Sequence, residues 1–468
     1  MKKFLIFSLL LIFQFQFVNS QPLDSLWMYY YGQDSISEYA YDVVLTYDSG
    51  YLVVGKRYSG WPGKIEGAII ISIDKDGQLI WDKNFSTSNH DDFQSIITTY
   101  DSNFVAGGNL SGLAWLIKMD INGDTLWTKS YGDNFGGITS VQELMNNELV
   151  ITGNAIGYGQ SYDFYLMKIN QYGDTIWTHK YNYEDNYVRS YCVKQTFDGG
   201  FIISAGYSTM SFVNIPIILK TGINGDTLWS IHNIDSDAKF PEILVDVDTI
   251  YFIGSALRYK ENKIAKDAIL IKMKSDGEII WIKDYGEPTS MEMGYSFTFT
   301  NSGNILIVGE NSNESGNIYT FETDKNGELI WEKSYVGNGM SHIPFSVKTV
   351  YENNYIITGI SNTKPFLFKL GEKPSGINCE NEQIDIRLRV SPNPVKSTAT
   401  IDFVLDQKEL ADISIYSFNG EKISQIIKKQ FSKGNHKLYW ETSSLQSGIY
   451  FVKMKSGNSV VVKKIIHL

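Results

Sequence analysis

Seven tryptophans recur at a nearly constant interval, and this recurrence constrains the fold more than any other feature of the chain. The gaps between them are 54, 46, 50, 52, 52 and 50 residues, and the residues are Trp27, Trp81, Trp127, Trp177, Trp229, Trp281 and Trp331. A period of about 50 residues with strand-like flanks is typical of radial or stacked β-repeats. We therefore interpret residues 21–370 as one repetitive all-β domain.

Each repeat contains four segments with the pattern of β-strands. The second segment is apolar and ends on glycine, as at residues 51–55, and the third is apolar throughout, as at residues 114–119. A tight glycine turn leads to the fourth segment, which carries the Trp. In six repeats an aromatic residue follows the Trp after four positions: Tyr31, Phe85, Tyr131, Tyr181, Tyr285 and Tyr335. Because residues four apart share one face of a strand, we expect both rings to pack on the neighbouring sheet.

The two ends of the repetitive region are incomplete and complement each other. Trp27 lies on a Trp segment with no other repeat segment before it, and the last repeat, residues 344–370, lacks a Trp segment. The N-terminal segment is expected to complete the seventh sheet, as in β-propellers, where ring closure removes exposed sheet edges. A solenoid would instead carry a distinct cap at each end. The predicted fold is a seven-bladed β-propeller.

Residues 1–20 have the pattern of a secretory signal peptide. Lys2 and Lys3 precede a short apolar run, and Val18 and Ser20 fit the positions before a cleavage site. The apolar run is too short to span a membrane, and we expect no transmembrane segment. The protein is therefore expected to be secreted or displayed on the outer cell surface.

Charge and cysteine content exclude several classes of protein. Residues 385–468 carry 13 Lys or Arg and 7 Asp or Glu, whereas residues 21–384 carry a net charge of −19. This acidic body excludes nucleic acid, whose recognition requires clustered basic charge. The chain has two cysteines, Cys192 and Cys379, which excludes a disulfide scaffold.

Several turns resemble functional motifs but lack their essential parts. Residues 120–124 resemble part of a calcium loop without the flanking helices, and their Asn-Gly pair supplies the positive φ of a hairpin turn. Residues 46–50 and 196–200 resemble the beginning of the Asp-box of sialidases, without its Thr-Trp. Residues 120–127 resemble the tryptophan-docking repeat of quinoprotein dehydrogenases, without its Thr-Gly-Lys. We expect no metal and no cofactor, and we assign no catalytic residue.

Candidate ligand-binding residues lie in the loops between second and third strands and between blades. These loops vary in length and composition, whereas short glycine hairpins occupy the opposite face, and variable loops on a rigid scaffold commonly carry binding sites. Their arginines and aromatic residues are typical anchors for glycans and proteins: Arg57, Tyr58, Trp61, Tyr158, Tyr162, Tyr183, Arg189, Arg258 and Tyr259. The alternative is that each ring covers a blade edge.

The predicted function is therefore binding or adhesion, with a glycan or a protein as the ligand. Two alternatives stay open. One is a propeller enzyme that acts on glycans as a hydrolase or lyase, which would gather acidic, His, Tyr or Arg groups with perturbed pKa values at the central pore. The other is a structural or interaction protein with no small ligand.

A second β-rich module follows the repeats. Residues 371–384 have the character of a linker, and residues 385–468 contain about seven short strand patterns, which predicts a small immunoglobulin-like sandwich. Its landmarks, in order along the chain, are Pro392, Asn393 and Pro394, then Gly420, then Gly448 and Tyr450, and finally Lys463 and Lys464.

These landmarks resemble the type A C-terminal sorting domain of the type IX secretion system of Bacteroidetes, and the repeats are similar to degenerate Trp/Gly propeller repeats of secreted proteins from the same bacteria. The resemblance implies export to the periplasm by the signal peptide and passage across the outer membrane by the type IX machinery. It also implies cleavage of the sorting domain, with release of the cargo or its attachment to surface lipopolysaccharide. An ordinary adhesive sandwich is the alternative.

Overall fold

The computed structural model divides into two compact units, Met1–Pro374 and Ser375–Leu468. It describes residues 22–32, 36–58, 67–86, 91–132, 135–156, 162–183, 187–208, 214–232, 234, 237–260, 263–287, 291–311, 317–335, 340–351, 353–372, 388–391, 395–405, 407–417, 422–443, 445, 448–456 and 459–467. Every regular element in this part of the chain is a β-strand. No described helix has the length and apolarity needed to cross a membrane.

The first unit consists of four-stranded antiparallel sheets, which we call blades 1 to 7. A single parallel bridge between Tyr162 and Tyr187 joins blades 3 and 4. The strands of blades 1 to 4 are β2 (Ser37–Leu45), β3 (Tyr51–Tyr58), β4 (Gly67–Ile73) and β5 (Leu79–Asn84); β6 (Asp92–Thr98), β7 (Phe104–Leu110), β8 (Leu113–Met119) and β9 (Thr125–Tyr131); β10 (Phe135–Glu143), β11 (Leu149–Ile156), β12 (Tyr162–Ile169) and β13 (Thr175–Tyr181); and β14 (Tyr187–Gln195), β15 (Phe201–Ser208), β16 (Asn214–Thr221) and β17 (Thr227–His232).

Blade 7 combines strands from both ends of the unit. The N-terminal strand β1 lies antiparallel to β28, with Asp24 opposite Gly371 and Tyr30 opposite Phe366. The strands of blades 5 to 7 are β18 (Ala238–Val245), β19 (Thr249–Lys260), β20 (Lys263–Lys274) and β21 (Ile279–Tyr285); β22 (Glu292–Phe299), β23 (Ile305–Asn311), β24 (Asn317–Thr323) and β25 (Leu329–Tyr335); and β26 (His342–Thr349), β27 (Tyr355–Ser361), β28 (Lys364–Gly371) and β1 (Asp24–Tyr30).

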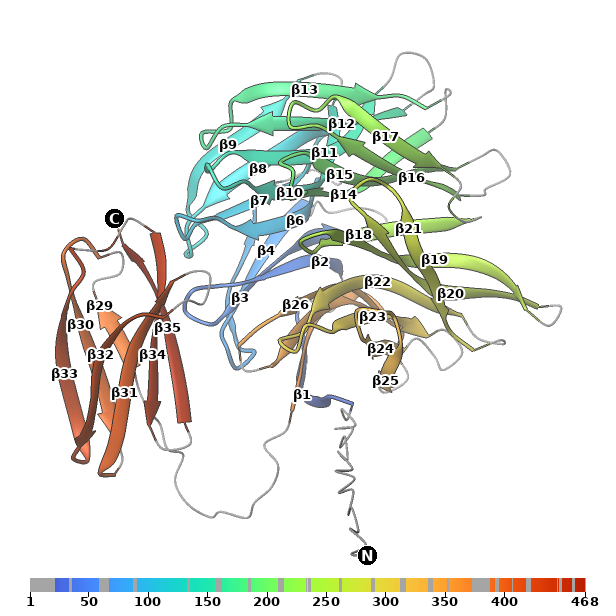
Figure 1. The fold of residues 1–468 in the computed structure, drawn as a ribbon. Helices are drawn as coiled ribbons and strands as arrows, with labels where there is room; N and C mark the ends of the chain where they lie inside the picture. Colours follow the sequence, from blue (N-terminus) through green and yellow to red (C-terminus); the bar gives the residue numbers. More distant parts are fainter. Residues whose placement is uncertain are drawn as a thin grey trace, which may run out of the picture. The chain divides into compact units, whose positions relative to one another are not determined.

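The blades form a closed ring (Figure 1), and we call the region around its axis, which the first strands enclose, the central channel. The first strand of each blade contacts the first strand of the next, in the order β2, β6, β10, β14, β18, β22 and β26, and β26 contacts β2. An apolar core cluster lies between each pair of neighbouring blades, including blades 7 and 1. The predicted seven-bladed propeller is confirmed. The first strands line its axis, and the Trp strands form its rim.

The recurring Trp and aromatic residue act together as a latch on the next blade. In blade 2, the Trp127 ring lies against Gly173 of blade 3, which adopts φ +82° and where an added Cβ atom would lie 3.3 Å from the ring. The Tyr131 hydroxyl donates a hydrogen bond of 2.9 Å to the carbonyl of the same glycine. The same hydroxyl-to-glycine bond recurs from Tyr31 to Gly77, from Tyr181 to Gly225 and from Tyr285 to Gly327. The repeat period therefore reflects a contact between blades.

The latch has a different acceptor at the junction of blades 6 and 7, near the point where the ring closes. Blade 7 has no hairpin turn between β28 and β1, because its fourth strand comes from the N-terminus. The Tyr335 hydroxyl of blade 6 donates instead to the carbonyl of Leu23, at 2.5 Å, and the Lys333 ammonium reaches the same oxygen at 3.0 Å. The segment before β1 thus takes the place that a turn glycine has in other blades.

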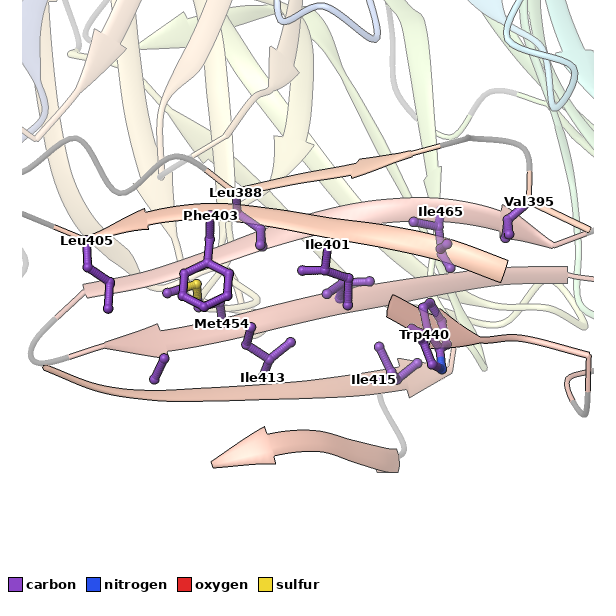
Figure 2. Packing of buried hydrophobic residues seen from close by; sticks show 13 residues of the cluster. Leu388, Val395, Ile401, Phe403, Leu405, Ile413, Ile415, Trp440, Met454 and Ile465 are labelled. Atoms are coloured by element: carbon purple, nitrogen blue, oxygen red, sulfur yellow. The ribbon is translucent and has the colours of Figure 1, made fainter. Parts of the chain in front are cut away.

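The second unit is a sandwich of two antiparallel sheets, as predicted. One sheet has the order β29 (Leu388–Ser391), β30 (Thr398–Leu405), β33 (Gly434–Glu441), and the other β32 (Lys422–Phe431), β31 (Glu409–Ser417), β34 (Gly448–Ser456), β35 (Ser459–His467). Figure 2 shows side chains from both sheets meeting in one core, with Ile401 and Phe403 on β30 opposite Ile413, Ile415 and Met454. These alternating strands bury apolar residues on one face only, as a two-layer sandwich requires.

Candidate functional site

The wall of the central channel is built from one repeated position. A β-bulge interrupts the first strand of each blade, and the residue after it is polar in six blades and a buried cysteine in blade 4: Asp42, Ser95, Ser140, Cys192, Glu242, Ser296 and Ser346. Several of these side chains accept a backbone N–H from the next blade, at 3.1 Å from Ile96 to Asp42 and at 3.0 Å from Val347 to Ser296. This position therefore joins neighbouring blades at the axis.

Three charged groups meet inside the channel. The Lys348 ammonium of blade 7 lies 3.3 Å from Asp42 Oδ1 and 3.4 Å from Glu242 Oε1. Burial works to lower the pKa of Lys348, but the two carboxylates outweigh it and hold that pKa above its ordinary value. Ser346 also donates to Asp42 at 2.7 Å, and Ser296 donates to Glu242. Because bonds within the channel occupy both carboxylates, this cluster ties blades 1, 5, 6 and 7 together.

Aromatic residues at the bulges line the channel next to these polar groups. The ring of Phe345 lies 5.6 Å from that of Tyr41 and 6.2 Å from that of Tyr295. Burial raises the pKa values of both tyrosines, so both hydroxyls stay protonated. The Tyr295 hydroxyl lies 3.4 Å from Glu310, whose pKa is also raised by burial.

Two of the predicted ligand-binding arginines are engaged in ion pairs. Arg57 Nε lies 2.6 Å from Glu38, which is fully buried, and its terminal nitrogen lies 2.5 Å from Asp82. Arg258 lies 2.5 Å from Asp284 on the last strand of its own blade. Both guanidinium groups therefore brace strands within blade 1 and blade 5.

The other predicted residues lie on several blades. Tyr58 is exposed at the end of β3, and Arg189 is exposed on β14. Tyr183 is half-buried, and its ring lies 4.8 Å from His232 and 6.0 Å from Phe164. The backbones of Tyr162 and Tyr259 belong to β12 and β19, whereas Trp61 and Tyr158 lie outside the described residues.

A pocket of about 590 Å³ lies between blades 5 and 6, on the rim. Its walls are polar, and several of their charged groups form hydrogen bonds or ion pairs with each other. The Tyr319 hydroxyl donates to Glu332 at 2.5 Å, and Lys283 lies 2.6 Å from Glu328. Among the described residues, no group of His, Cys, Asp or Glu side chains is arranged to hold a metal ion.

The most exposed large apolar side chains near the channel lie on the glycine-hairpin face. They occupy the first corner of the turn between the first and second strands in six of the seven blades. We call this set the crown: Tyr47, Tyr100, Met145, Phe197, Val247 and Tyr351. Phe197 is 79% exposed and Met145 is 84% exposed. Because the first strands line the axis, these turns surround one mouth of the channel; blade 6 carries Asn301 at this position.

The turns that carry the crown are held rigidly. In blade 1 the Thr46 hydroxyl donates to Asp48 at 2.5 Å, and Asp48 also accepts the N–H of Gly50. Blades 2 and 4 repeat this arrangement with Thr99 and Asp101 and with Thr196 and Asp198. The sequence contained the signal for the crown, because these turns are the Asp-box-like segments, whose recurring aromatic residue is exposed.

One carboxyl beside the crown has a strongly shifted pKa. Glu143, at the end of β10, accepts the N–H of Tyr100 at 2.6 Å. Burial raises the pKa of Glu143 to about 7, and the nearby Asp101 adds to this shift. Glu143 therefore titrates near neutral pH.

Residues 389–467 match the family described as the secretion system C-terminal sorting domain. The second unit is a type IX sorting domain. Its presence makes the chain a cargo that is exported to the cell surface or released. The family match covers the sandwich and leaves the propeller unassigned.

Within the sorting domain, four of the eight predicted motif residues lie on the last two strands. Gly448 begins β34 opposite His467, and the half-buried Tyr450 contacts the core. Lys463 is exposed on β35, and Lys464 pairs with Phe451 through its backbone. Pro392, Asn393, Pro394 and Gly420 lie outside the described residues.

Solved structures with a similar course of the chain share little sequence with it. PorZ, a surface component of the type IX secretion system of Porphyromonas gingivalis, is 10% identical with a TM-score of 0.42, over 92% of this chain and 59% of PorZ. Sqt1 from Chaetomium thermophilum is 12% identical with a TM-score of 0.45, over 72% of this chain and 82% of that chain. No curated protein matches the sequence. The fold assignment therefore rests on the strand pairing.

Proposed function

We propose that this chain is an exported binding protein whose propeller recognises a glycan or protein partner at the cell surface. The signal peptide would deliver it to the periplasm, and the sorting domain would then direct it through the type IX machinery. After cleavage of the sorting domain, the propeller would be released or attached to surface lipopolysaccharide.

The single observation that supports binding most strongly is the exposed crown on rigid turns. Exposed apolar side chains gathered on one face commonly mark an interaction site. On the loop face, the exposed Tyr58 and Arg189 are a second proposed contact region.

The binding proposal is tested with the purified mature chain. We would screen it against arrays of bacterial and host glycans and of extracellular proteins, and confirm each hit by titration calorimetry. Saturable binding to a member of either array supports the proposal. No saturable binding on either array, together with turnover of a glycan substrate, would replace the proposal with an enzymatic function.

The export route is tested separately, in a bacterium with a type IX system. A variant that lacks residues 385–468 is expected to accumulate in the periplasm, whereas the full chain reaches the surface or the medium. Surface display of the truncated chain, measured by protease accessibility on intact cells, would contradict the route.

A further inference from the structure

We propose that the crown binds a neutral polysaccharide chain that lies across the channel mouth. This inference rests on the proposed binding function and names the ligand class and the site. The crown places exposed aromatic rings of blades 1, 2, 4 and 7 and the aliphatic Met145 and Val247 on the turns around the axis, on one face of the propeller. The apolar C–H face of a sugar ring stacks on the electron-rich face of an aromatic side chain.

The charge around the crown favours a neutral ligand. The residue after Tyr47, Tyr100, Phe197 and Val247 is aspartate in each case. Asp101 and Asp198 are ion-paired with lysines of their own blades, so the carboxylates of Asp48 and Asp248 are the ones that would repel a uronic acid or a sulfated or phosphorylated glycan, because like charges at close range cost free energy. A neutral chain avoids this cost.

The same carboxylates are not arranged to recognise a basic protein. Asp101 is paired with Lys118 at 2.6 Å, and Asp198 is paired with Lys220 at 2.9 Å. The Asp48 carboxylate accepts bonds from Thr46 and Gly50 in its own turn. The hydrogen bonds and ion pairs of these carboxylates are thus made within their own blades, and the rings are what the crown offers to a partner.

A polymer suits the spacing of the crown better than a single sugar. Each ring stands on a separate blade, so one sugar can stack on one ring only. A chain that crosses several turns makes contacts that add, because each later contact forms at a high effective concentration. The rigid turns reduce the entropy lost when these side chains become ordered.

The test is titration of the full mature chain with two probes, a neutral glucan and a polyuronic acid of similar length. A triple variant, Tyr47→Ala, Phe197→Ala and Tyr351→Ala, removes three rings that are exposed and therefore contribute little to folding. The matched control is Leu126→Ala with Leu228→Ala, which removes exposed apolar side chains from the outer strands. Circular dichroism verifies that both variants keep the fold.

We expect the wild type and the control to bind the glucan, and the polyuronic acid to bind at least about tenfold more weakly, a difference of about 1.4 kcal/mol. The triple variant should lose about 100-fold or more in glucan affinity. Glucan binding should change little between about 0.05 M and 0.5 M salt, because no charges are paired in it.

Three outcomes overturn the inference. The triple variant could bind the glucan with the same affinity as the control variant does, which would place the glucan site elsewhere while leaving the binding function intact. The polyuronic acid could bind more tightly, which would contradict the neutral ligand. The glucan could fail to bind while a protein from the arrays binds, which would overturn the ligand class and leave the broader proposal standing.

Discussion

Deletion of residues 22–32 should destabilise the whole propeller, because these residues supply the fourth strand of blade 7. Without them, β28 loses its only partner on the rim side, and the latches into and out of blade 7 are broken. The deletion removes Tyr31 and with it the hydrogen bond to the Gly77 carbonyl. It also removes the Leu23 carbonyl that accepts the hydrogen bond from Tyr335. The effect should therefore spread beyond blade 7 to its two neighbours.

The size of the effect follows from the groups that are lost. Leu23 and Tyr31 are both buried, and burial of a large apolar side chain contributes about 1.5–3 kcal/mol. The two hydroxyl-to-carbonyl bonds contribute about 1 kcal/mol each. Together these terms give about 6 kcal/mol, before the strand pairing of β1 is counted. A typical folded domain is stable by about 5–15 kcal/mol, so the deletion should remove much of the total.

The assay is differential scanning calorimetry of the mature chain, the deletion variant and a transposed variant. In the transposed variant, residues 24–32 follow Gly371 through a copy of the turn at residues 120–124, since Gly371 already lies opposite Asp24. We expect a lower Tm or loss of the propeller transition on deletion, and recovery on transposition. A deletion variant whose Tm stays within about 2 °C of the full chain would refute the closing role.

Three further variants test other contacts. Tyr181→Phe keeps the ring and removes the bond to Gly225, so the free energy of unfolding should fall by about 1 kcal/mol in denaturant titrations, and no change would exclude the latch. Lys348→Met leaves two facing carboxylates without their cation, so the free energy of unfolding should fall by about 2 kcal/mol near neutral pH, between the values for exposed and buried pairs; an unchanged free energy of unfolding would contradict this reasoning. The folded-state pKa of Glu143 is raised to about 7, so its contribution to stability is present at acidic pH and is lost as the pH rises towards and through 7. Glu143→Gln should therefore flatten the dependence of Tm on pH over this range. An unchanged slope would contradict this role of Glu143.

The fold could be predicted because the repeated Trp residues correspond to a contact that each blade makes with the next. A Trp ring that packs on a turn glycine of the next blade must recur once per blade, so counting Trp residues counts sheets. The closing strand was also readable, since Trp27 stands alone before the first complete repeat and the last repeat ends without a Trp. Local pattern and ring geometry therefore agree.

The candidate site was less accessible from the sequence, because exposure and pairing are properties of the fold. Arg57 has the composition of a ligand anchor, yet its partners Glu38 and Asp82 come from other strands of the blade. Phe197 occupies a turn that resembles an Asp-box, and only the surrounding ring shows that its side chain is exposed at the channel mouth. The Lys348 cluster draws on blades 1, 5 and 7, whose order around the axis is set by closure.

The most direct test of the binding account is hydrogen–deuterium exchange on the mature chain with and without saturating ligand from the glycan and protein arrays. The account predicts slower exchange in the turns at residues 46–50, 99–103 and 196–200, which carry or adjoin the crown, and unchanged exchange in the rim turns at residues 120–124 and 170–174. Protection confined to the loops between second and third strands, with the crown turns unchanged, would contradict it and place the ligand on the opposite face.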